Sequence, residues 1–161
     1  MCVPQRQAVQ GYPHTNQLDV QIKKDKITLE HCLRLYHYEY DLDCKIMRLS
    51  NPYGEGQNIY GKQGFIAIVL RNLLEKKTVV LHGDGTTIRD FVHISDVVQA
   101  SLLLATTDSK KTLFNIGSGK GITLNTVVVA IEKILGRTIS VEHSVQSIHD
   151  IPYSVLDISK A

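Results

Sequence analysis

Tryptophan is absent from this 161-residue sequence, and cysteine and aromatic residues are few. The three cysteines form no C-x-x-C pair, which argues against a disulfide framework or a structural zinc site. Aromatic residues make up 6% of the chain, too few to favour a stacking platform for single-stranded nucleic acid. The 18 basic and 16 acidic residues leave a net charge of +2, without the basic excess of a nucleic-acid-binding domain. We therefore expect no nucleic-acid partner and no metal ion.

Long apolar runs are also absent. No stretch approaches the roughly 20 apolar residues that span a bilayer, and the start shows no apolar core of a signal peptide. A composition of 43% hydrophobic and 21% charged residues is typical of a globular domain. We expect a cytoplasmic protein that does not enter a membrane.

Apolar residues are arranged in alternating helical and strand patterns from Lys26 onward. Residues 1–25 are polar and without a period, which predicts an irregular lead-in. The pattern after them predicts helices over 26–40, 64–76, 96–106 and 124–135, with Ser95 or Asp96 capping the third helix and Thr123 the fourth. Strands are expected at 45–49, 78–82, 88–92, 113–116 and 138–142, a long loop at 50–63, and the start of a helix at 157–161. Strands that alternate with helices indicate an α/β fold.

Two glycine pairs follow predicted strands, at 54–56 and 117–119. A dinucleotide-binding loop needs G-x-G-x-x-G, and both pairs lack the third glycine. The G-K-G at 119–121 lacks the Ser or Thr of a phosphate-binding P-loop. We interpret all of these glycines as turn residues.

Two polar residues on the 88–93 segment leave alternatives open. The planar guanidinium of Arg89 suits a pyrophosphate, but a structural pairing with Asp84 or Asp90 is as plausible on spacing alone. A structural role is favoured for His93, since no acidic or histidine partner stands at metal-ligand spacing.

Asp150 and Asp157 are seven residues apart in a proline-containing loop, where capping explains them more simply than acid–base chemistry.

Four segments resemble motifs of the extended short-chain dehydrogenases that act on nucleotide sugars, and UDP-glucose 4-epimerases most closely. They read R-L-S-N-P-Y-G-E-G-Q at 48–57, G-D-G-T-T-I-R-D-F-V-H-I-S-D at 83–96, F-N-I-G-S-G at 114–119 and D-I-P…L-D-I-S-K-A at 150–161. Their order and spacing match the family over residues 26–161. The resemblance implies an incomplete Rossmann sheet, formed by the C-terminal part of such an enzyme, with a small substrate-binding lobe.

The resemblance also implies roles for individual residues. Asn51 and Arg89 would contact the diphosphate of a nucleotide sugar, most plausibly a UDP-sugar, and Asp150 would be a further substrate contact. Gly64, Phe65 and the strand around Leu81 would line the base and ribose pocket. Lys26 would be the lysine of the catalytic Y-x-x-x-K pair. Lys26 and Pro52 would be the residues of this chain that face the NAD cofactor of the family.

Departures from the family pattern are as informative. The N-terminal half, with its glycine-rich loop, has no counterpart, and Ile22 stands where the catalytic tyrosine belongs. An isoleucine cannot exchange the proton that sugar oxidation requires. Residues 146–149 read Q-S-I-H, without the arginine that often precedes the tail aspartate. We expect the chain alone to bind no NAD and to catalyse no turnover.

Two other interpretations stay open. Exposed edges of an incomplete sheet would favour a non-catalytic interaction module, which forms a homo-oligomer or pairs with a separate chain. The third interpretation is a remnant without a selected function, motivated by Ile22 and by the altered 146–149 stretch.

Overall fold

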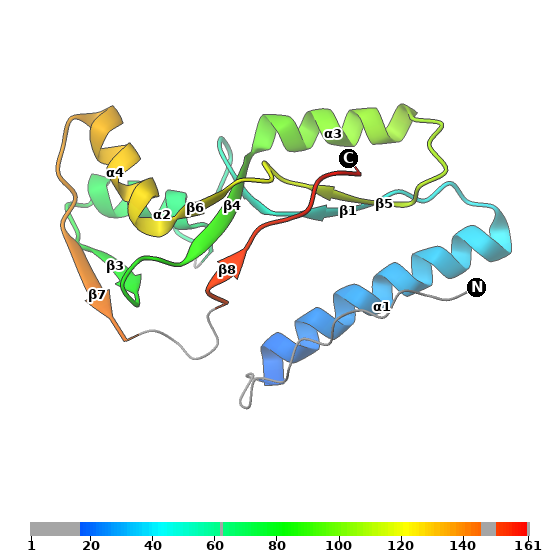
Figure 1. The fold of residues 1–161 in the computed structure, drawn as a ribbon, viewed down its shortest axis with the longest axis horizontal. Helices are drawn as coiled ribbons and strands as arrows, with labels where there is room; N and C mark the ends of the chain where they lie inside the picture. The colour runs from blue at the N-terminus through cyan, green and yellow to red at the C-terminus, as the bar shows by residue number, and fades with distance from the viewer. Residues whose placement is uncertain (1–16, 62, 146–150, 161) are drawn as a thin grey trace.

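The computed structural model describes residues 17–61, 63–145 and 151–160, with side chains from residue 25 onward. The helices are α1 (Gln17–Tyr40), α2 (Phe65–Leu74), α3 (Ile94–Thr106) and α4 (Leu124–Leu135). The strands are β1 (Ile46–Leu49), β2 (Asn51–Tyr53), β3 (Val79–His82), β4 (Ile88–His93), β5 (Leu113–Ile116), β6 (Gly121–Thr123), β7 (Val141–Ser144) and β8 (Tyr153–Ser154). Strands and helices alternate through most of the chain, which confirms the predicted α/β fold (Figure 1).

The strands form three separate small sheets. β1 pairs with β5 in parallel, and β3 pairs with β7 in parallel. β4 lies between β2, which is parallel to it, and β6, which is antiparallel; β8 also pairs with β4. Because β4 connects the part that contains α2 and α4 with the part that contains α3, its residues lie at the centre of the molecule (Figure 1).

The main hydrophobic core joins the β3–β7 pair to α2 and α4. Both helices turn one apolar face toward the strands, as their 3.6-residue periodicity predicts. Thr123 caps α4 by accepting the N–H of Thr126, as the sequence predicts, and Gly136 ends the helix with φ +62°. Buried core residues are Val69, Val79, Leu81, Val127, Val128, Ile131 and Ile139.

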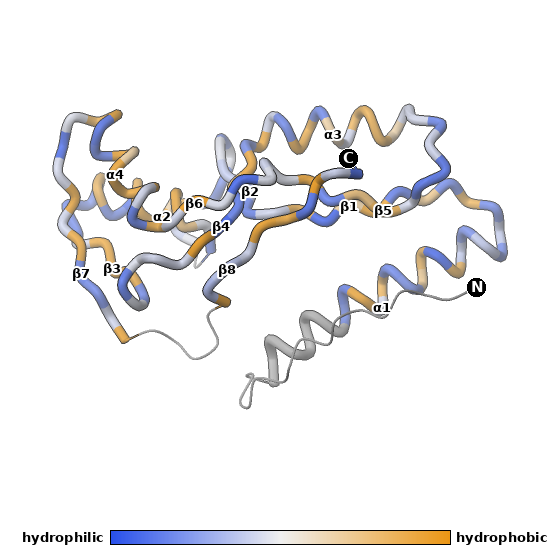
Figure 2. The backbone as a smooth tube through the Cα atoms, viewed as in Figure 1, coloured by the Kyte–Doolittle hydropathy of each residue, from blue (hydrophilic) through white to orange (hydrophobic). Residues whose placement is uncertain are grey.

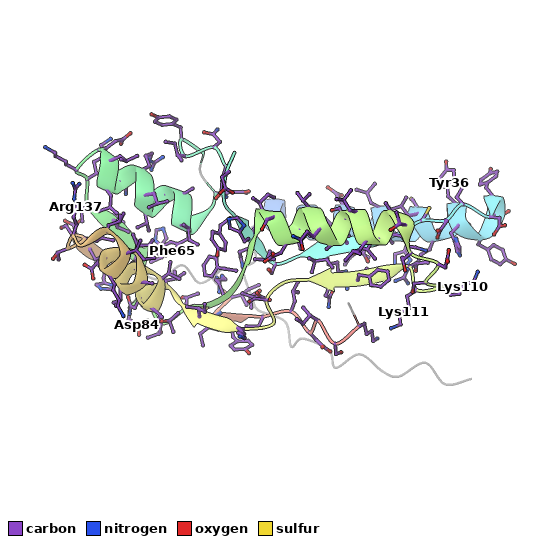
Figure 3. All side chains as sticks on the ribbon, turned by 90° about the horizontal axis from the view of Figure 1, so that it is seen from above. Tyr36, Phe65, Asp84, Lys110, Lys111 and Arg137 are labelled. Carbon is purple, nitrogen blue, oxygen red and sulfur yellow. The ribbon has the colours of Figure 1, made fainter. Side chains whose placement is uncertain are left out.

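The β1–β5 pair lies between α3 and α1 (Figures 1 and 3). Met47 points toward α3, where Ser101 Oγ is 3.5 Å from its sulfur. Arg48 points to the opposite side and binds Glu30 of α1 with two hydrogen bonds. Consecutive strand residues face opposite sides of a sheet, so this alternation fixes which helix covers which face.

Several boundaries differ from those expected. Residues 17–25 belong to α1 and not to an irregular lead-in, because no proline or glycine interrupts the chain between Gln17 and Asp25; residues 1–16 lie outside the described part. His93, and not Ser95 or Asp96, caps α3, since its ring nitrogen accepts the N–H of Ser95. β7 starts three residues later than expected and ends two residues later, and residues 159–160 form a turn in place of a helix start. The short strands β2, β6 and β8 were not expected.

Candidate substrate cleft

A cleft of about 1270 Å³ opens between α1, the β1–β2 segment and the start of α2. Six of the predicted site residues line it together: Lys26, Asn51, Pro52, Gly64, Phe65 and Arg89. The sequence separates these residues by up to 63 positions, and the fold brings them to one surface. We refer to this cavity as the main cleft.

The remaining predicted residues lie elsewhere. Leu81 is 1% exposed in the hydrophobic core, and it borders a smaller pocket that shares Phe65 and Arg89 with the main cleft. Asp150, like residues 146–149, lies outside the described residues. Ile22 lies on α1 one helical turn before Lys26, and its side chain is not described.

The main cleft is electropositive. Its charged lining residues are three cations, Lys26, Arg48 and Arg89, and one carboxylate, Glu30. Glu30 and Arg48 neutralise each other through a fork of two hydrogen bonds of 2.7 and 2.5 Å, and the Arg48 hydrogen bond lowers the pKa of the Glu30 carboxyl. The excess positive charge therefore comes from Lys26 and Arg89, and an anionic ligand would be favoured there.

The guanidinium of Arg89 is oriented by backbone carbonyls, and not by Asp84 or Asp90. Its Nη1 donates to Ile88 O at 2.9 Å and to Ile151 O at 2.6 Å. Within the described residues, its Nε and Nη2 have no hydrogen-bond acceptor. Asn51 lies on the neighbouring strand and donates to Asp90 O at 2.7 Å, which leaves its side-chain oxygen as an acceptor. Together these residues present several polar groups to the main cleft.

Gly64 gives the main cleft part of its shape. It precedes α2 with φ +94°, a conformation that glycine adopts easily and other residues adopt at a cost. A Cβ at this position would overlap the side-chain amide of Gln57, so Gln57 packs directly over the glycine. The family resemblance points to Gly64, which lies outside the four motifs, whereas Gln57 ends the first motif and was assigned no role.

Two further polar residues escaped prediction. Asp90 is fully buried in β4, and Ser50 has a buried hydroxyl without a hydrogen-bond partner among the described residues. A buried unpaired hydroxyl costs free energy, so Ser50 is a natural place for a water molecule or a ligand atom. The signal for Asp90 was its position in β4 between Ile88 and Val92, which face the same side of the strand, because a carboxylate buried there needs hydrogen-bond partners.

The described residues include no glycine-rich loop whose amides are free to hold a dinucleotide. The amides of Ser118 and Gly119 bind the carboxylate of Asp90, so this glycine pair is a structural turn, as expected. A Cβ on Gly54 would meet Ile94 and His93, so that glycine permits close packing of the chain on itself. No glycine-rich loop with open amides occurs in the described part, and only Lys26 and Pro52 stand where the family resemblance expects a cofactor.

Other types of site find no support in the described residues. No group of three His, Cys, Asp or Glu side chains lies close enough together to hold a metal ion. Within the same residues, no helix has the length and hydropathy needed to cross a membrane. Cys32 and Cys44 are free thiols. His93 caps α3 and packs edge-on against Tyr53 with a centroid distance of 5.2 Å, which matches the structural role favoured by the sequence.

Comparison with known proteins identifies relatives over most of the described chain. UDP-glucose 4-epimerase of Mycolicibacterium smegmatis is 32% identical over 136 residues, which are 84% of this chain and 44% of that protein. The dTDP-4-dehydro-6-deoxyglucose reductase of Escherichia coli is 39% identical over 107 residues, 66% of this chain and 34% of that protein. The chain thus spans about a third to a half of the length of these relatives.

Comparison with solved structures identifies relatives of the same kind. The UDP-glucose 4-epimerase of Thermotoga maritima, determined with UDP-glucose, superposes with a TM-score of 0.78 at 34% identity over 84% of this chain and 43% of that one. The UDP-N-acetylglucosamine 4-epimerase of Methanobrevibacter ruminantium, in complex with UDP-N-acetylmuramic acid, gives a TM-score of 0.83 at 26% identity over 97% and 49%. A model of the NAD dependent epimerase/dehydratase family matches residues 23–117. The resemblance seen in the four motifs is confirmed, and the chain belongs to the NAD dependent epimerase/dehydratase family.

Proposed function

We propose that this chain is the nucleotide-sugar-binding portion of an epimerase of this family, and that the main cleft binds the diphosphate of a UDP-sugar. The observation that carries the proposal is the arrangement of Arg89. Two backbone carbonyls hold its Nη1, while no described residue accepts from its Nε or Nη2, in a cleft with excess positive charge. A preoriented guanidinium binds phosphate oxygens with little further loss of side-chain entropy.

The chain also offers residues for the second diphosphate contact, the base, the ribose and the sugar of the ligand. Asn51, adjacent to Arg89 across the β2–β4 pair, offers a second diphosphate contact. Gly64 and Phe65, with the small pocket that Leu81 borders, provide a partly apolar surface for the base and ribose. The sugar would then extend toward Lys26 and Pro52. Relatives whose structures contain UDP-glucose or UDP-N-acetylmuramic acid support the choice of a uridine diphosphate.

We further infer that this chain alone neither binds NAD nor turns over a substrate. Ile22 offers no acid or base one turn before Lys26. The described residues offer a cofactor only Lys26 and Pro52, without amides that would hold its pyrophosphate. NAD, when bound in the family, supplies hydride transfer; the residues seen here would bind and orient the nucleotide sugar.

Calorimetric titration with UDP, dTDP, GDP and NAD tests the proposal. We expect UDP to bind and NAD to give no heat. Arg89→Ala should weaken UDP binding by tenfold or more, since hydrogen bonds to charged groups are worth about 1.5–3 kcal/mol. Arg137→Ala is the matched control, because Arg137 lies beyond α4 at the outer end of the molecule (Figure 3). Equal UDP affinities of the wild type and the Arg89→Ala variant would contradict the proposed site.

A second candidate function is association with another polypeptide. Four apolar side chains, Leu29, Leu33, Tyr36 and Tyr40, follow one face of α1, and each is between 41% and 68% exposed. Figure 2 shows hydrophobic residues recurring along α1 and α3, on both sides of the β1–β5 pair. A row of exposed apolar side chains along one helix face is typical of an interface. Light scattering would test this function, with a species larger than a monomer as the expected result.

A further inference from the structure

We call residues 151–158 the C-terminal segment. This segment runs beside β4 and is connected to it by hydrogen bonds at several points. The N–H of Ile88 donates to Pro152 O at 2.9 Å, and β8 pairs with β4 in register Arg89 to Ser154. Asn115 Nδ2 donates to Asp157 O at 2.8 Å on the far side of the segment. The C-terminal segment is therefore a part of the sheet built around β4.

Asp90 makes the central connection of this arrangement. Its Oδ1 accepts hydrogen bonds from the N–H of Ser118 at 2.9 Å and from the hydroxyl of Ser118 at 2.6 Å. Its Oδ2 accepts from the N–H of Gly119 and the N–H of Leu156, both at 3.3 Å. The side chain is 0% exposed and none of these partners is a cation. A buried carboxylate without a counter-ion is tolerated only when donors satisfy its oxygens, and here the donors come from two other segments.

Arg89 depends on the same segment from the other side of β4. Its Nη1 donates to the carbonyl of Ile151, five residues before Leu156. The Ile151 carbonyl can orient the guanidinium only while the C-terminal segment lies against β4. Asp90, through the N–H of Leu156, is the buried side chain among the contacts that hold the segment there, together with the β8–β4 pairing and the Ile88–Pro152 hydrogen bond.

We propose that Asp90 is a positioning residue for substrate binding, which sets the orientation of Arg89 by fixing the C-terminal segment. This inference rests on the proposed binding of UDP beside Arg89. Asp90 itself touches no ligand, because it is fully buried and its carboxylate oxygens accept the N–H and O–H groups of the protein.

The test is Asp90→Asn. An amide replaces one of the two acceptor oxygens by a donor, so either the Ser118 donors or the N–H groups of Gly119 and Leu156 lose their acceptor. We expect faster amide hydrogen exchange in residues 151–158 and a UDP affinity lower by roughly three- to tenfold, the effect of losing a few modest hydrogen bonds. The matched control is Asp84→Asn, because Asp84 also accepts an N–H and a hydroxyl, from Thr86, but does not contact the segment.

A double-mutant cycle separates positioning from general destabilisation. In an Arg89→Ala background, Asp90→Asn should change the UDP affinity by less than about twofold, since the group it positions is absent. The same loss of affinity in both backgrounds would overturn the inference, and so would faster exchange of the segment with unchanged UDP affinity in the single variant.

Asn115→Ala provides a second route if Asp90→Asn does not fold. It releases the segment at Asp157 and leaves Asp90 intact. It should show the same faster exchange and the same dependence on Arg89, and an unchanged UDP affinity would contradict the inference. If the wild type binds no UDP, the proposed function fails instead, and hydrogen exchange of residues 151–158 alone decides whether Asp90 holds the segment.

Discussion

At the residue scale, the backbone conformation of one glycine shapes the main cleft. Gly64 and Gly56 both have positive φ, +94° and +81°, but their surroundings differ. A Cβ on Gly64 would overlap the amide of Gln57, whereas a Cβ on Gly56 would meet no atom within 4 Å. Comparing the two glycines therefore separates the free-energy cost of the backbone conformation from the effect of a new side chain in the main cleft.

Gly64→Ala and Gly56→Ala should therefore lose similar stability and differ in ligand binding. Each puts an alanine into a left-handed conformation, at a cost of about 1–2 kcal/mol. Only Gly64→Ala pushes Gln57 out of its place in the cleft, so only this variant should also weaken UDP binding. Denaturant unfolding and calorimetry of the two variants provide the comparison, and a matching loss of affinity in Gly56→Ala would contradict the role given to Gln57.

At the element scale, an ion pair connects helix α1 to the strand that follows it. The Glu30–Arg48 fork connects it to β1, while its apolar face remains exposed. The hydrogen bond from Arg48 holds the pKa of Glu30 below its usual value. A carboxyl with a lowered pKa in the folded state stabilises the fold above its unfolded pKa of about 4.3, and this contribution is lost as the pH falls through the lowered folded value.

Glu30→Gln should thus destabilise the protein at neutral pH and not in acid. We expect a loss of about 0.5–1 kcal/mol at pH 7, a small value because Arg48 is 40% exposed and solvent screens the pair. The difference from the wild type should shrink as the pH drops below about 4. Urea unfolding at several pH values measures it, with Glu39→Gln on the same helix as the control. A difference that persists unchanged in acid would refute the ion-pair explanation.

The sequence predicted elements with a strong period and missed those without one. α2 and α4 carry apolar residues at helical spacing, and their limits lie within two residues of those expected. β2, β6 and β8 contain two or three residues each, too few for any period, and exist only because β4 offers them hydrogen bonds. The start of α1 was placed nine residues too late because its polar first turns show no apolar face.

The candidate site was predictable only through the family resemblance. Two of its motifs contain Asn51 and Arg89, and the resemblance also pointed to Gly64 and Phe65 outside the motifs; the fold brings all four into one cleft. It did not indicate that the partner of Arg89 would be the carbonyl of Ile151, since a backbone contact between residues 62 positions apart depends on the tertiary fold and not on side-chain identity. The roles assigned to these residues stay predictions until ligand binding is measured.

At the scale of the whole molecule, the edge of β1 opposite β5 has no strand paired with it in the described chain. The N–H groups of Ile46 and Ser50 bind Thr112 O and Ile116 O, so the alternation along β1 directs the N–H groups of Met47 and Leu49 to the other edge. No strand of the described chain pairs with that edge. Parallel sheets are normally buried and contain more than two strands, so β1 is well suited to receive another strand.

Leu49→Pro should prevent association if this edge is an interface. Proline removes the outward N–H of Leu49 and keeps the N–H groups that bind β5. We expect light scattering to detect a species larger than a monomer for the wild type and a monomer for the variant. Val80→Pro is the control, because Val79 and Gly83 bind β7 and Val80 points its N–H away, in a different sheet. A wild type that stays monomeric at high concentration would argue against the interface.

The register of the strands also has a consequence for the integrity of the chain. β1 and β2 do not pair with each other; β1 pairs with β5 and β2 pairs with β4, partners 67 and 40 residues farther along. Tyr60, 73% exposed, lies in the loop that follows β2. A protease that cleaved the backbone beside Tyr60 would produce two peptides whose strands still complete each other's sheets. The nicked protein would hold together without the covalent bond, and the fold would tolerate a break at the edge of its own proposed binding cleft.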